Sequence, residues 1–187
     1  MELEINKELT TKLFEIDGLS LKNLFHLDRP LWLLLDDLEA FVETHGTSDL
    51  GPDVQVEGKV FIGKGTIIRK GAYFRGPVVI GEGCLIGHGV EIVRSLILDG
   101  AKIPHLNYVG DSIVGSRVNM GAGSVCANMR FDKGEISIGG VKTQRKKLGA
   151  FIGDDASIGC NAVLNPGSVI FPRKFVLPCK NVGGIVR

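Results

Sequence analysis

An aliphatic or aromatic residue recurs at every sixth position through much of the chain, and this spacing limits the possible folds more than any other feature. The positions form one unbroken run and a second run near the C-terminus: Val56, Ile62, Ile68, Phe74, Ile80, Ile86, Ile92 and Leu98, then Ile152, Ile158, Leu164, Ile170 and Val176. An amphipathic helix needs apolar residues three and four apart, and a half-buried strand alternates, so neither explains the spacing. A sustained period indicates a repeat architecture. The sequence therefore predicts an all-β fold, a hexapeptide-repeat parallel β-helix with short strands stacked on three flat faces.

Two stretches break the six-residue spacing, and we expect functional residues there. The first, residues 101–111, shifts the register, so that Val109, Val114 and Met120 continue it with one five-residue step. The second predicts an extruded loop or hairpin at about residues 127–150. Interruptions in a solenoid often carry function because the coils hold the inserted residues rigidly. The β-helix itself is predicted over residues 54–178, and a C-terminal tail over residues 179–187.

Residues 1–53 lie outside the repeat and are predicted to form an N-terminal helical cap. Residues 13–17 fit a strand or loop, and residues 20–27 fit a short helical turn. An amphipathic helix is predicted over residues 29–45, because Asp28 can accept from the first N–H groups and Pro30 needs no donor there. Its apolar stripe consists of Leu31, Leu34, Leu35, Leu38, Phe41 and Val42. This helix would cover the open end of the solenoid, pack beside its first coils, or dock another protein.

Composition and charge mainly exclude alternatives. The formal net charge of +1 over 187 residues gives no electrostatic reason to expect nucleic acid or a membrane surface as the main partner. We find no signal peptide and no apolar run of 18 residues, so we expect a cytoplasmic protein. The cysteines include no CxxC pair, which favours reduced thiols over a zinc site: Cys84, Cys126, Cys160 and Cys179.

Candidate catalytic residues gather around His105, in the first interruption. An imidazole with a pKa near neutrality suits a general base. Polar side chains surround it in sequence and, one coil later, in space: Asn107, Tyr108, Asp111, Asn119 and Asn128. The competing interpretation is that His105 braces the backbone at the break. His26, His45 and His88 lack such neighbours and are interpreted as bystanders.

Three segments resemble the acetyltransferase domain of the bifunctional N-acetylglucosamine-1-phosphate uridyltransferase/glucosamine-1-phosphate acetyltransferases: residues 105–111, 118–123 and 126–128. Residues 127–132 with 145–149 are closer still to the C-terminal domains of archaeal-type sugar-1-phosphate nucleotidylyltransferases. The likeness covers about residues 54–178. It implies a left-handed β-helix that forms a homotrimer, with acetyl-CoA and a sugar phosphate bound between neighbouring subunits. The handedness rests on the resemblance alone, because parallel crossovers are ordinarily right-handed.

The resemblance also assigns roles residue by residue. His105 matches the base that deprotonates the sugar amine, Glu91 a carboxylate near it, and Asn128 a residue that lines the amine site. The matches for substrate binding are Arg75, Arg94, Tyr108, Asn119 and Lys133. The matches for the acetyl-CoA site are Ala122, whose backbone N–H would face the thioester oxygen, and Cys160, Arg173 and Lys174. No metal is implied.

The sequence departs from the family pattern at three positions. Val93, followed by Arg94, stands where the family has a phosphate-binding lysine. Lys133 lies one position before the place of a second lysine, which Gly134 occupies, and Met129 replaces a tyrosine. The Gly-rich loop of the family's nucleotidyltransferase domain does not occur, so nucleotide transfer is not expected of this chain.

Three functional hypotheses follow. The first is acetyl transfer from acetyl-CoA to the amine of a glucosamine- or galactosamine-1-phosphate, in the synthesis of sugar-nucleotide precursors. The second is a catalytically silent sugar-phosphate-binding or regulatory subunit that partners a separate nucleotidyltransferase. The third, a zinc enzyme like the trimeric β-helical carbonic anhydrases, is disfavoured because the chain has no His-x4-His pair.

Overall fold

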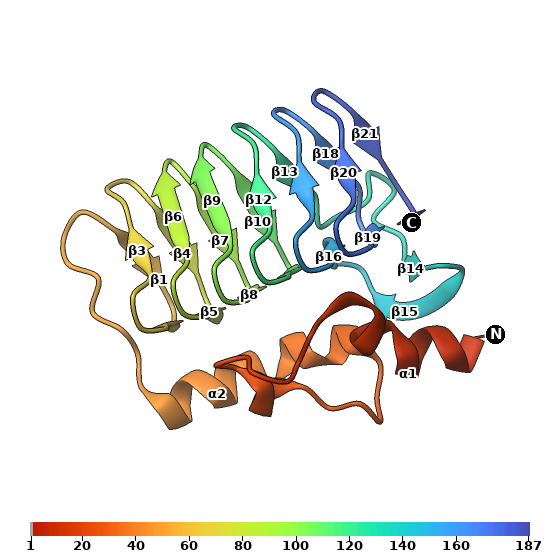
Figure 1. Cartoon of the computed structure of the whole chain (residues 1–187), viewed down its shortest axis with the longest axis horizontal. Coiled ribbons are helices and arrows are strands. Elements are labelled where there is room, and N and C mark those ends of the chain that lie inside the picture. The colour runs from red at the N-terminus through yellow and green to blue at the C-terminus, as the bar shows by residue number, and fades with distance from the viewer. Residues whose placement is uncertain (1) are drawn as a thin grey trace.

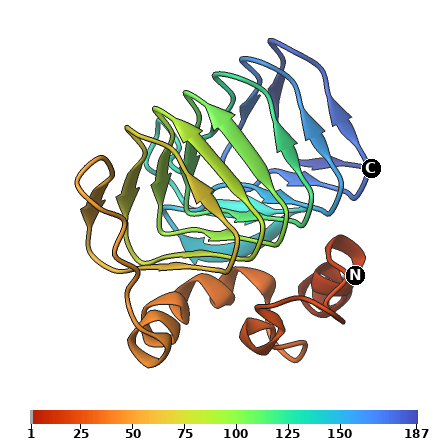
Figure 2. The same cartoon turned by 60° about the vertical axis from the view of Figure 1, so that its left-hand side comes forward.

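The structure is a computed structural model that describes residues 2–187, with side chains from Glu8 onward. Residues 55–186 form a parallel β-solenoid of about seven turns, with strands on three sheets (Figures 1 and 2). Sheet A contains β1 (Gln55–Glu57), β4 (Tyr73–Arg75), β7 (Glu91–Val93), β10 (Tyr108–Gly110), β13 (Val125–Cys126), β18 (Val163–Leu164) and β21 (Asn181–Val182). Sheet B contains β2 (Val60–Ile62), β5 (Val78–Ile80), β8 (Leu96–Ile97), β11 (Ile113–Val114), β16 (Phe151–Ile152), β19 (Val169–Ile170) and β22 (Ile185–Val186). Sheet C contains β3 (Ile67–Ile68), β6 (Leu85–His88), β9 (Lys102–His105), β12 (Asn119–Met120), β17 (Ser157–Ile158) and β20 (Phe175–Val176). The predicted fold class is confirmed as a parallel β-solenoid with short N-terminal helices.

The interior of the solenoid is built from the residues of the six-residue repeat. In sheet A, for example, Phe74 pairs with Val56 of the preceding coil and with Ile92 of the following one. Such in-register pairing stacks apolar side chains along each sheet, and Phe74, Ile92 and their equivalents are almost wholly buried. The apolar residue at every sixth position therefore forms one continuous core along the solenoid axis.

The predicted register is wrong at one position, and the error has a physical cause. Ile97, not Leu98, pairs with Ile80 and points into the solenoid. Leu96 and Leu98 are also fully buried, but they pack in a second apolar cluster outside the solenoid, against the N-terminal segment. Because the N-terminal segment covers sheet B, both faces of that sheet are apolar, and the sequence does not distinguish its inner residues.

With Ile97 inside, residues 101–111 are not an interruption. Ile103 and Val109 follow Ile97 at six-residue spacing and lie in the core, on β9 and β10. The short steps are those from Ile92 to Ile97 and from Val109 to Val114, and both cross the corner between sheets A and B. The irregularity that the sequence displays therefore belongs to this one corner, which we call the A–B corner.

The N-terminal segment lies against the outer face of sheet B and does not cover an end of the solenoid (Figure 2). It contains α1 (Glu2–Leu13), the 3-10 helices η1 (Lys22–Leu24) and η2 (Leu31–Asp36), and α2 (Leu38–His45). Leu13 and Leu38 are fully buried in the cluster that also holds Phe151 of β16. Of the alternatives considered for this segment, the structure supports packing beside the coils.

The single helix predicted over residues 29–45 is wrong in its first half. Residues 31–36 form the 3-10 helix η2, and α2 starts only at Leu38. Asp28 does not cap either helix, because η2 follows Pro30 and no side chain bonds its first turn. A 3-10 helix stacks residues three apart, so Leu31 and Leu34 both turn towards the core and are buried. α1 was not predicted, and η1 lies within the helical turn predicted for residues 20–27.

Residues 127–149 leave the coil after β13 and return at β16. They contain an antiparallel hairpin, β14 (Ile136–Ile138) with β15 (Val141–Arg145). The hairpin does not project into solvent, because Ile136 and Ile138 are buried in the outer cluster over sheet B. Figure 1 shows it beside α1, under the last coils. A bridge between Met129 and Lys147 closes the neck of this segment.

The predicted C-terminal tail is also wrong. Asn181 pairs with Val163 in sheet A, and Ile185 pairs with Val169 in sheet B, so the solenoid continues to residue 186. Val182 follows Val176 at the regular six-residue step, so this strand could have been predicted; only the step from Val182 to Val186, across the A–B corner, is shortened, to four residues. Between residues 2 and 187, no helix is both long enough and apolar enough to span a bilayer.

Candidate functional site

The A–B corner carries a cavity of about 290 Å³ that gathers polar side chains from four successive coils. Its lining comprises Arg75, Gly76, Val93, Arg94, Tyr108, Asp111, Asn128, Met129 and Lys147. Arg75 ends β4, and Arg94, Asp111 and Asn128 follow β7, β10 and β13. Since each coil adds one residue to the same corner, residues 17 to 19 apart in the sequence become neighbours in space. We call this the corner cavity.

Cationic side chains dominate the corner cavity, and two of them are paired with carboxylates. Nε and Nη2 of Arg75 donate to Oε1 of Glu91 at 3.1 and 2.6 Å. Arg94 donates through Nε to Asp111. The third cation is Lys147, whose ammonium has no carboxylate within 4 Å among the side chains that the structure describes. Arg94 also lies 3.9 Å from Asp36, which pairs with Arg145, so four cations face three carboxylates and leave an excess positive charge, which suits a phosphate.

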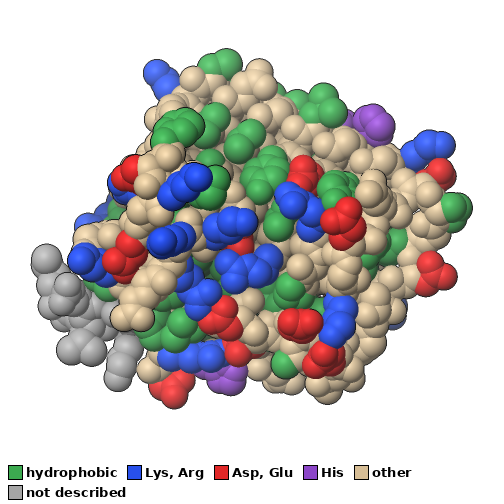
Figure 3. Space-filling model, turned by 180° about the vertical axis from the view of Figure 1, so that it is seen from behind, with side chains coloured by type: hydrophobic (Ala, Val, Ile, Leu, Met, Phe, Trp, Pro, Cys, Tyr) green, Lys and Arg blue, Asp and Glu red, His purple; other side chains and the backbone are tan. Residues whose placement is uncertain are grey.

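Side chains of both charges also lie on one face of the molecule at large. Figure 3 shows the face behind that of Figure 1, where several Lys and Arg side chains gather left of centre and Asp and Glu side chains lie around them. The formal net charge of +1 gives no electrostatic preference for a general anionic surface such as nucleic acid. A small ligand with one localised negative charge fits this arrangement better.

Tyr108 supplies a neutral donor to the corner cavity. Burial raises the pKa of its phenol, and the negative charges of Glu91 and Asp111 raise it further. The hydroxyl therefore stays protonated near neutral pH and can donate to a ligand oxygen. A Cβ atom on Gly110 would come within 2.7 Å of both the Tyr108 hydroxyl and the Asn128 amide, so only glycine leaves these two groups room to approach each other.

His105 lies on a different corner, between sheets C and A. It ends β9, is exposed, and stands directly beside His88 in the ladder of sheet C. Sheet A, whose β10 strand is roughly 10 Å long, separates this corner from the corner cavity. The structure thus does not bring His105 together with Arg75, Arg94 or Asn128 within one chain.

Asn107 shapes the corner at His105. Its Oδ1 accepts from the His105 N–H at 3.0 Å, and its Nδ2 donates to the Gly121 carbonyl at 2.7 Å and to Ser124 Oγ at 2.9 Å. The side chain is buried and all of these bonds are internal. Asn107 is therefore a structural residue, and the expectation that it could position a ligand is not supported by its geometry.

The residues expected at the acetyl-CoA site fall into two groups. Ala122 and Cys160 follow His105 along the C–A corner, where Gly123 N–H bonds the His105 carbonyl and Asn161 N–H bonds the Ala122 carbonyl. Arg173 and Lys174 lie at the corner between sheets B and C, at the opposite edge of sheet C. Asn119 projects from sheet C between them, paired with Ser157 and exposed.

Lys133 lies outside the corner cavity, and Lys147 lines it instead. Lys133 belongs to an exposed turn that is held by a bidentate ion pair between Arg130 and Asp132. Lys147 is on the return strand of the neck, opposite Met129. Sequence reasoning missed Lys147 because it counted forward from Asn128, across a segment of variable length. Counting back five residues from the regular repeat position Ile152 would have found it.

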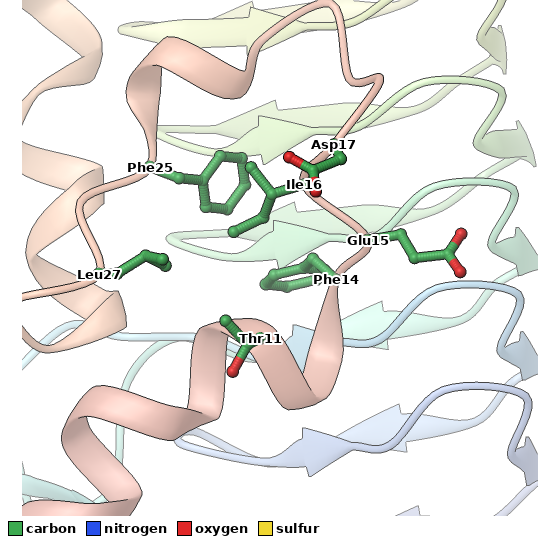
Figure 4. A pocket seen from close by; sticks show the side chains of 7 residues that line it. All are labelled: Thr11, Phe14, Glu15, Ile16, Asp17, Phe25 and Leu27. Atoms are coloured by element: carbon green, nitrogen blue, oxygen red, sulfur yellow. The ribbon is translucent and has the colours of Figure 1, made fainter.

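A larger pocket of about 590 Å³ lies in the N-terminal segment (Figure 4). Its floor is formed by the tilted rings of Phe14 and Phe25, 5.8 Å apart, with Ile16 and Leu27. It contains none of the predicted site residues. No group of three His, Cys, Asp or Glu side chains that could hold a metal ion occurs in the part of the chain described.

Comparisons with known proteins show the family of the chain. A family model described as the GMPPB C-terminal domain matches residues 56–183, most of the chain. The chain belongs to the hexapeptide-repeat acetyltransferase domains. It is 34% identical over 162 residues to a bifunctional sugar-1-phosphate nucleotidylyltransferase/acetyltransferase from Sulfurisphaera tokodaii, covering 73% of this chain and 40% of that protein. It is 30% identical over 186 residues to the bifunctional protein GlmU of Methanococcus aeolicus, covering 86% of this chain and 45% of that protein.

The chain therefore spans less than half the length of either relative. Among solved structures, a hexapeptide transferase family protein from Anaplasma phagocytophilum matches 72% of each chain with a TM-score of 0.56 and 16% identity. At this identity the match supports the solenoid fold alone. The resemblance inferred from the motifs is thus confirmed at the level of the family.

Proposed function

We propose that this hexapeptide-repeat domain transfers an acetyl group from acetyl-CoA to the amine of a hexosamine 1-phosphate. The observation that carries the proposal is the corner cavity, which sets Arg75, Arg94 and Lys147 beside the hydrogen-bonding groups of Tyr108 and Asn128. The guanidinium and ammonium groups would hold the phosphate, and Tyr108 and Asn128 would hold the sugar. Arg94 and Lys147 would supply the two positive charges that the family's lysines provide and that Val93 and Gly134 lack.

In the proposed reaction the sugar amine attacks the carbonyl carbon of the thioester. The new C–N bond forms, the C–S bond breaks, and the coenzyme leaves as a thiol after taking up a proton. His105 would accept the proton that the amine loses. The N–H of Ala122 would stabilise the developing negative charge on the thioester oxygen, since its carbonyl is used by Asn161 and its N–H has no partner among the described backbone bonds.

The proposed residues occupy three corners of one chain, so we propose that neighbouring copies complete the site in a homotrimer. Sheet B is covered by the N-terminal segment, whereas sheets A and C carry the proposed residues and have no covering segment among residues 2–187. A cyclic arrangement of three copies would set one corner of each copy against a face of the next. Sedimentation equilibrium at micromolar concentration tests this: we expect about three times 20.1 kDa, and a monomer contradicts the shared site.

The activity itself is tested by release of the coenzyme thiol from acetyl-CoA. We expect release with glucosamine 1-phosphate or galactosamine 1-phosphate, and much less with glucosamine, which lacks the phosphate. Calorimetric titration with the same sugars separates the alternative hypothesis. Binding of a sugar phosphate without thiol release would indicate the silent, sugar-phosphate-binding subunit, and neither binding nor release would reject both.

A further inference from the structure

Asp111 occupies the centre of the A–B corner, between Arg94 of the preceding coil and Asn128 of the following one. Its side chain is only 3% exposed. Its backbone has a φ of 46°, in the left-handed region that non-glycine residues seldom adopt. The N–H donates to the Val93 carbonyl and the carbonyl accepts from Gly149 N–H, both at 2.8 Å, so the residue is fixed on both sides.

The two carboxylate oxygens of Asp111 serve two different neighbours. Oδ1 accepts from Nε of Arg94, and Oδ2 accepts from Nδ2 of Asn128 at 2.5 Å. An ionised carboxylate has no hydrogen to donate, so Asn128 must turn its nitrogen towards Asp111. The carbonyl oxygen of Asn128 is thereby left for a ligand donor in the corner cavity.

The same contact orients Arg94. With Nε held by Asp111, the outer nitrogens of the guanidinium extend to the rim, where Nη2 lies 3.4 Å from the Lys147 carbonyl and Nη1 lies 3.9 Å from Asp36. One buried carboxylate therefore fixes both a cation for the phosphate and an acceptor for the amine. A hydrogen bond of this kind from a neighbouring side chain fixes the position of a binding group within the small tolerance that catalysis requires.

We propose that Asp111 is a positioning residue, which sets the Arg94 guanidinium and the Asn128 carbonyl at a fixed separation that selects an acceptor with both a phosphate and an amine. This inference rests on the proposed function. The competing explanation is that Asp111 only anchors the extruded segment to the coil, through its backbone bond to Gly149. The two explanations differ in what an isosteric substitution does.

The test starts with Asp111→Asn, which keeps the shape and the backbone bonds. In this variant an amide faces both Arg94 and Asn128, and each of these neighbours also presents a donor. Either Arg94 loses its acceptor or Asn128 must rotate and turn its carbonyl away from the corner cavity. We expect kcat/KM for glucosamine 1-phosphate to fall by roughly 10- to 100-fold, the range of one charge-assisted hydrogen bond. KM for acetyl-CoA should not change.

The double variant Asp111→Asn/Asn128→Asp restores the pairing with the groups exchanged. The amide at position 111 can accept from Arg94 and donate to the carboxylate at position 128, whose second oxygen still faces the corner cavity as an acceptor. We expect it to recover at least about tenfold of the lost kcat/KM. A purely structural role predicts no such recovery, because neither substitution touches the backbone bonds of Asp111.

Asp99→Asn is the matched control. Asp99 is also a corner carboxylate, at the B–C corner, where it accepts from Ser20 N–H at 2.9 Å, Ser20 Oγ at 2.6 Å and Glu82 N–H at 2.7 Å. Its loss should lower the melting temperature without changing kcat/KM per folded molecule.

The outcomes separate the two proposals. If Asp111→Asn behaves like Asp99→Asn, or if the double variant is no better than the single one, the positioning role is overturned. If the parent protein binds glucosamine 1-phosphate but transfers no acetyl group, the proposed reaction fails, and the same variants are compared by their Kd for that sugar. A parent protein that neither binds nor turns over the sugar phosphate overturns both.

Discussion

Replacement of Arg75 by alanine tests the phosphate-binding role of the corner cavity most directly. A guanidinium has five N–H donors. Glu91 receives one from Nε and one from Nη2, so three remain for a ligand, enough for a bidentate contact with a phosphate. Because charge-assisted hydrogen bonds are the strong ones, we expect Arg75→Ala to raise KM for glucosamine 1-phosphate by roughly 10- to 100-fold.

The stability of the protein should hardly change. The Arg75 side chain is 43% exposed, and exposed ion pairs contribute little to folding. The assay is thiol release at varied acceptor concentration, run in parallel with glucosamine, which has no phosphate. The increase in KM should be confined to the phosphorylated acceptor. The KM of Arg75→Lys for the phosphorylated acceptor should lie between those of the wild type and Arg75→Ala, because an ammonium keeps the positive charge but lacks the planar, paired N–H donors of a guanidinium.

Arg117→Ala is the matched control for Arg75. Arg117 is 53% exposed, and its Nε and Nη2 donate to Asp155 at 2.7 and 2.8 Å, but it lies at the B–C corner. Loss of this pair should leave the acceptor KM unchanged. An equal effect of both substitutions, or an unchanged KM in Arg75→Ala, would refute the argument that Arg75 binds the phosphate.

Three further predictions concern catalysis, stability and thiol reactivity. His105→Ala should lower kcat by roughly 10²- to 10⁴-fold with an unchanged melting temperature, and less at high pH, where the amine deprotonates unaided; reduced stability with normal activity per folded molecule would instead make His105 a brace. Phe151→Ala should lower the free energy of unfolding, measured by denaturant titration, by about 3–5 kcal/mol, because this ring is fully buried where the N-terminal segment meets sheet B. A loss below about 1 kcal/mol would mean that other contacts hold the N-terminal segment on the sheet. A thiol reagent at pH 8 should modify the exposed Cys160 and Cys179 quickly and spare the buried Cys84 and Cys126. Burial raises the pKa of Cys84 and raises that of Cys126 to about 12, so the reactive thiolate is scarce at these two residues; fast modification of all four thiols would contradict this.

The solenoid could be predicted from the sequence because its spacing is set by local geometry. Two of the three corners keep a constant six-residue step, and the inward residue at each sixth position is apolar, as at Ile80 and Ile86. The predicted register was wrong at Leu98, in sheet B, where the N-terminal segment packs on the outer face and makes both faces of the sheet apolar. Leu96, Ile97 and Leu98 are all buried, and hydrophobicity alone cannot tell which of them points inward.

The candidate site was predictable where it follows the repeat. Arg75, Arg94, Tyr108 and Asn128 lie on consecutive coils, so the resemblance could be carried across them without a gap. Lys147 could not be placed in this way, because the number of residues between Asn128 and β16 depends on the hairpin and not on the coil. The separation of His105 from the corner cavity was missed because the register error at Leu98 made residues 101–111 look like an interruption; with Ile97 inward, His105 falls between the inward Ile103 of sheet C and Val109 of sheet A.

The unequal corners have a consequence for how such a chain can change during evolution. From one inward residue to the next, the A–B corner takes six residues between Phe74 and Ile80, five between Val109 and Val114, and four between Val182 and Val186. Between Cys126 and Ile152 it accommodates the whole extruded segment. The two corners that flank sheet C keep the same six-residue step in every coil despite these differences. Deletions and insertions at the A–B corner are therefore absorbed locally, so a lineage can lengthen, shorten or replace the residues around its ligand without having to redesign the scaffold that supports them.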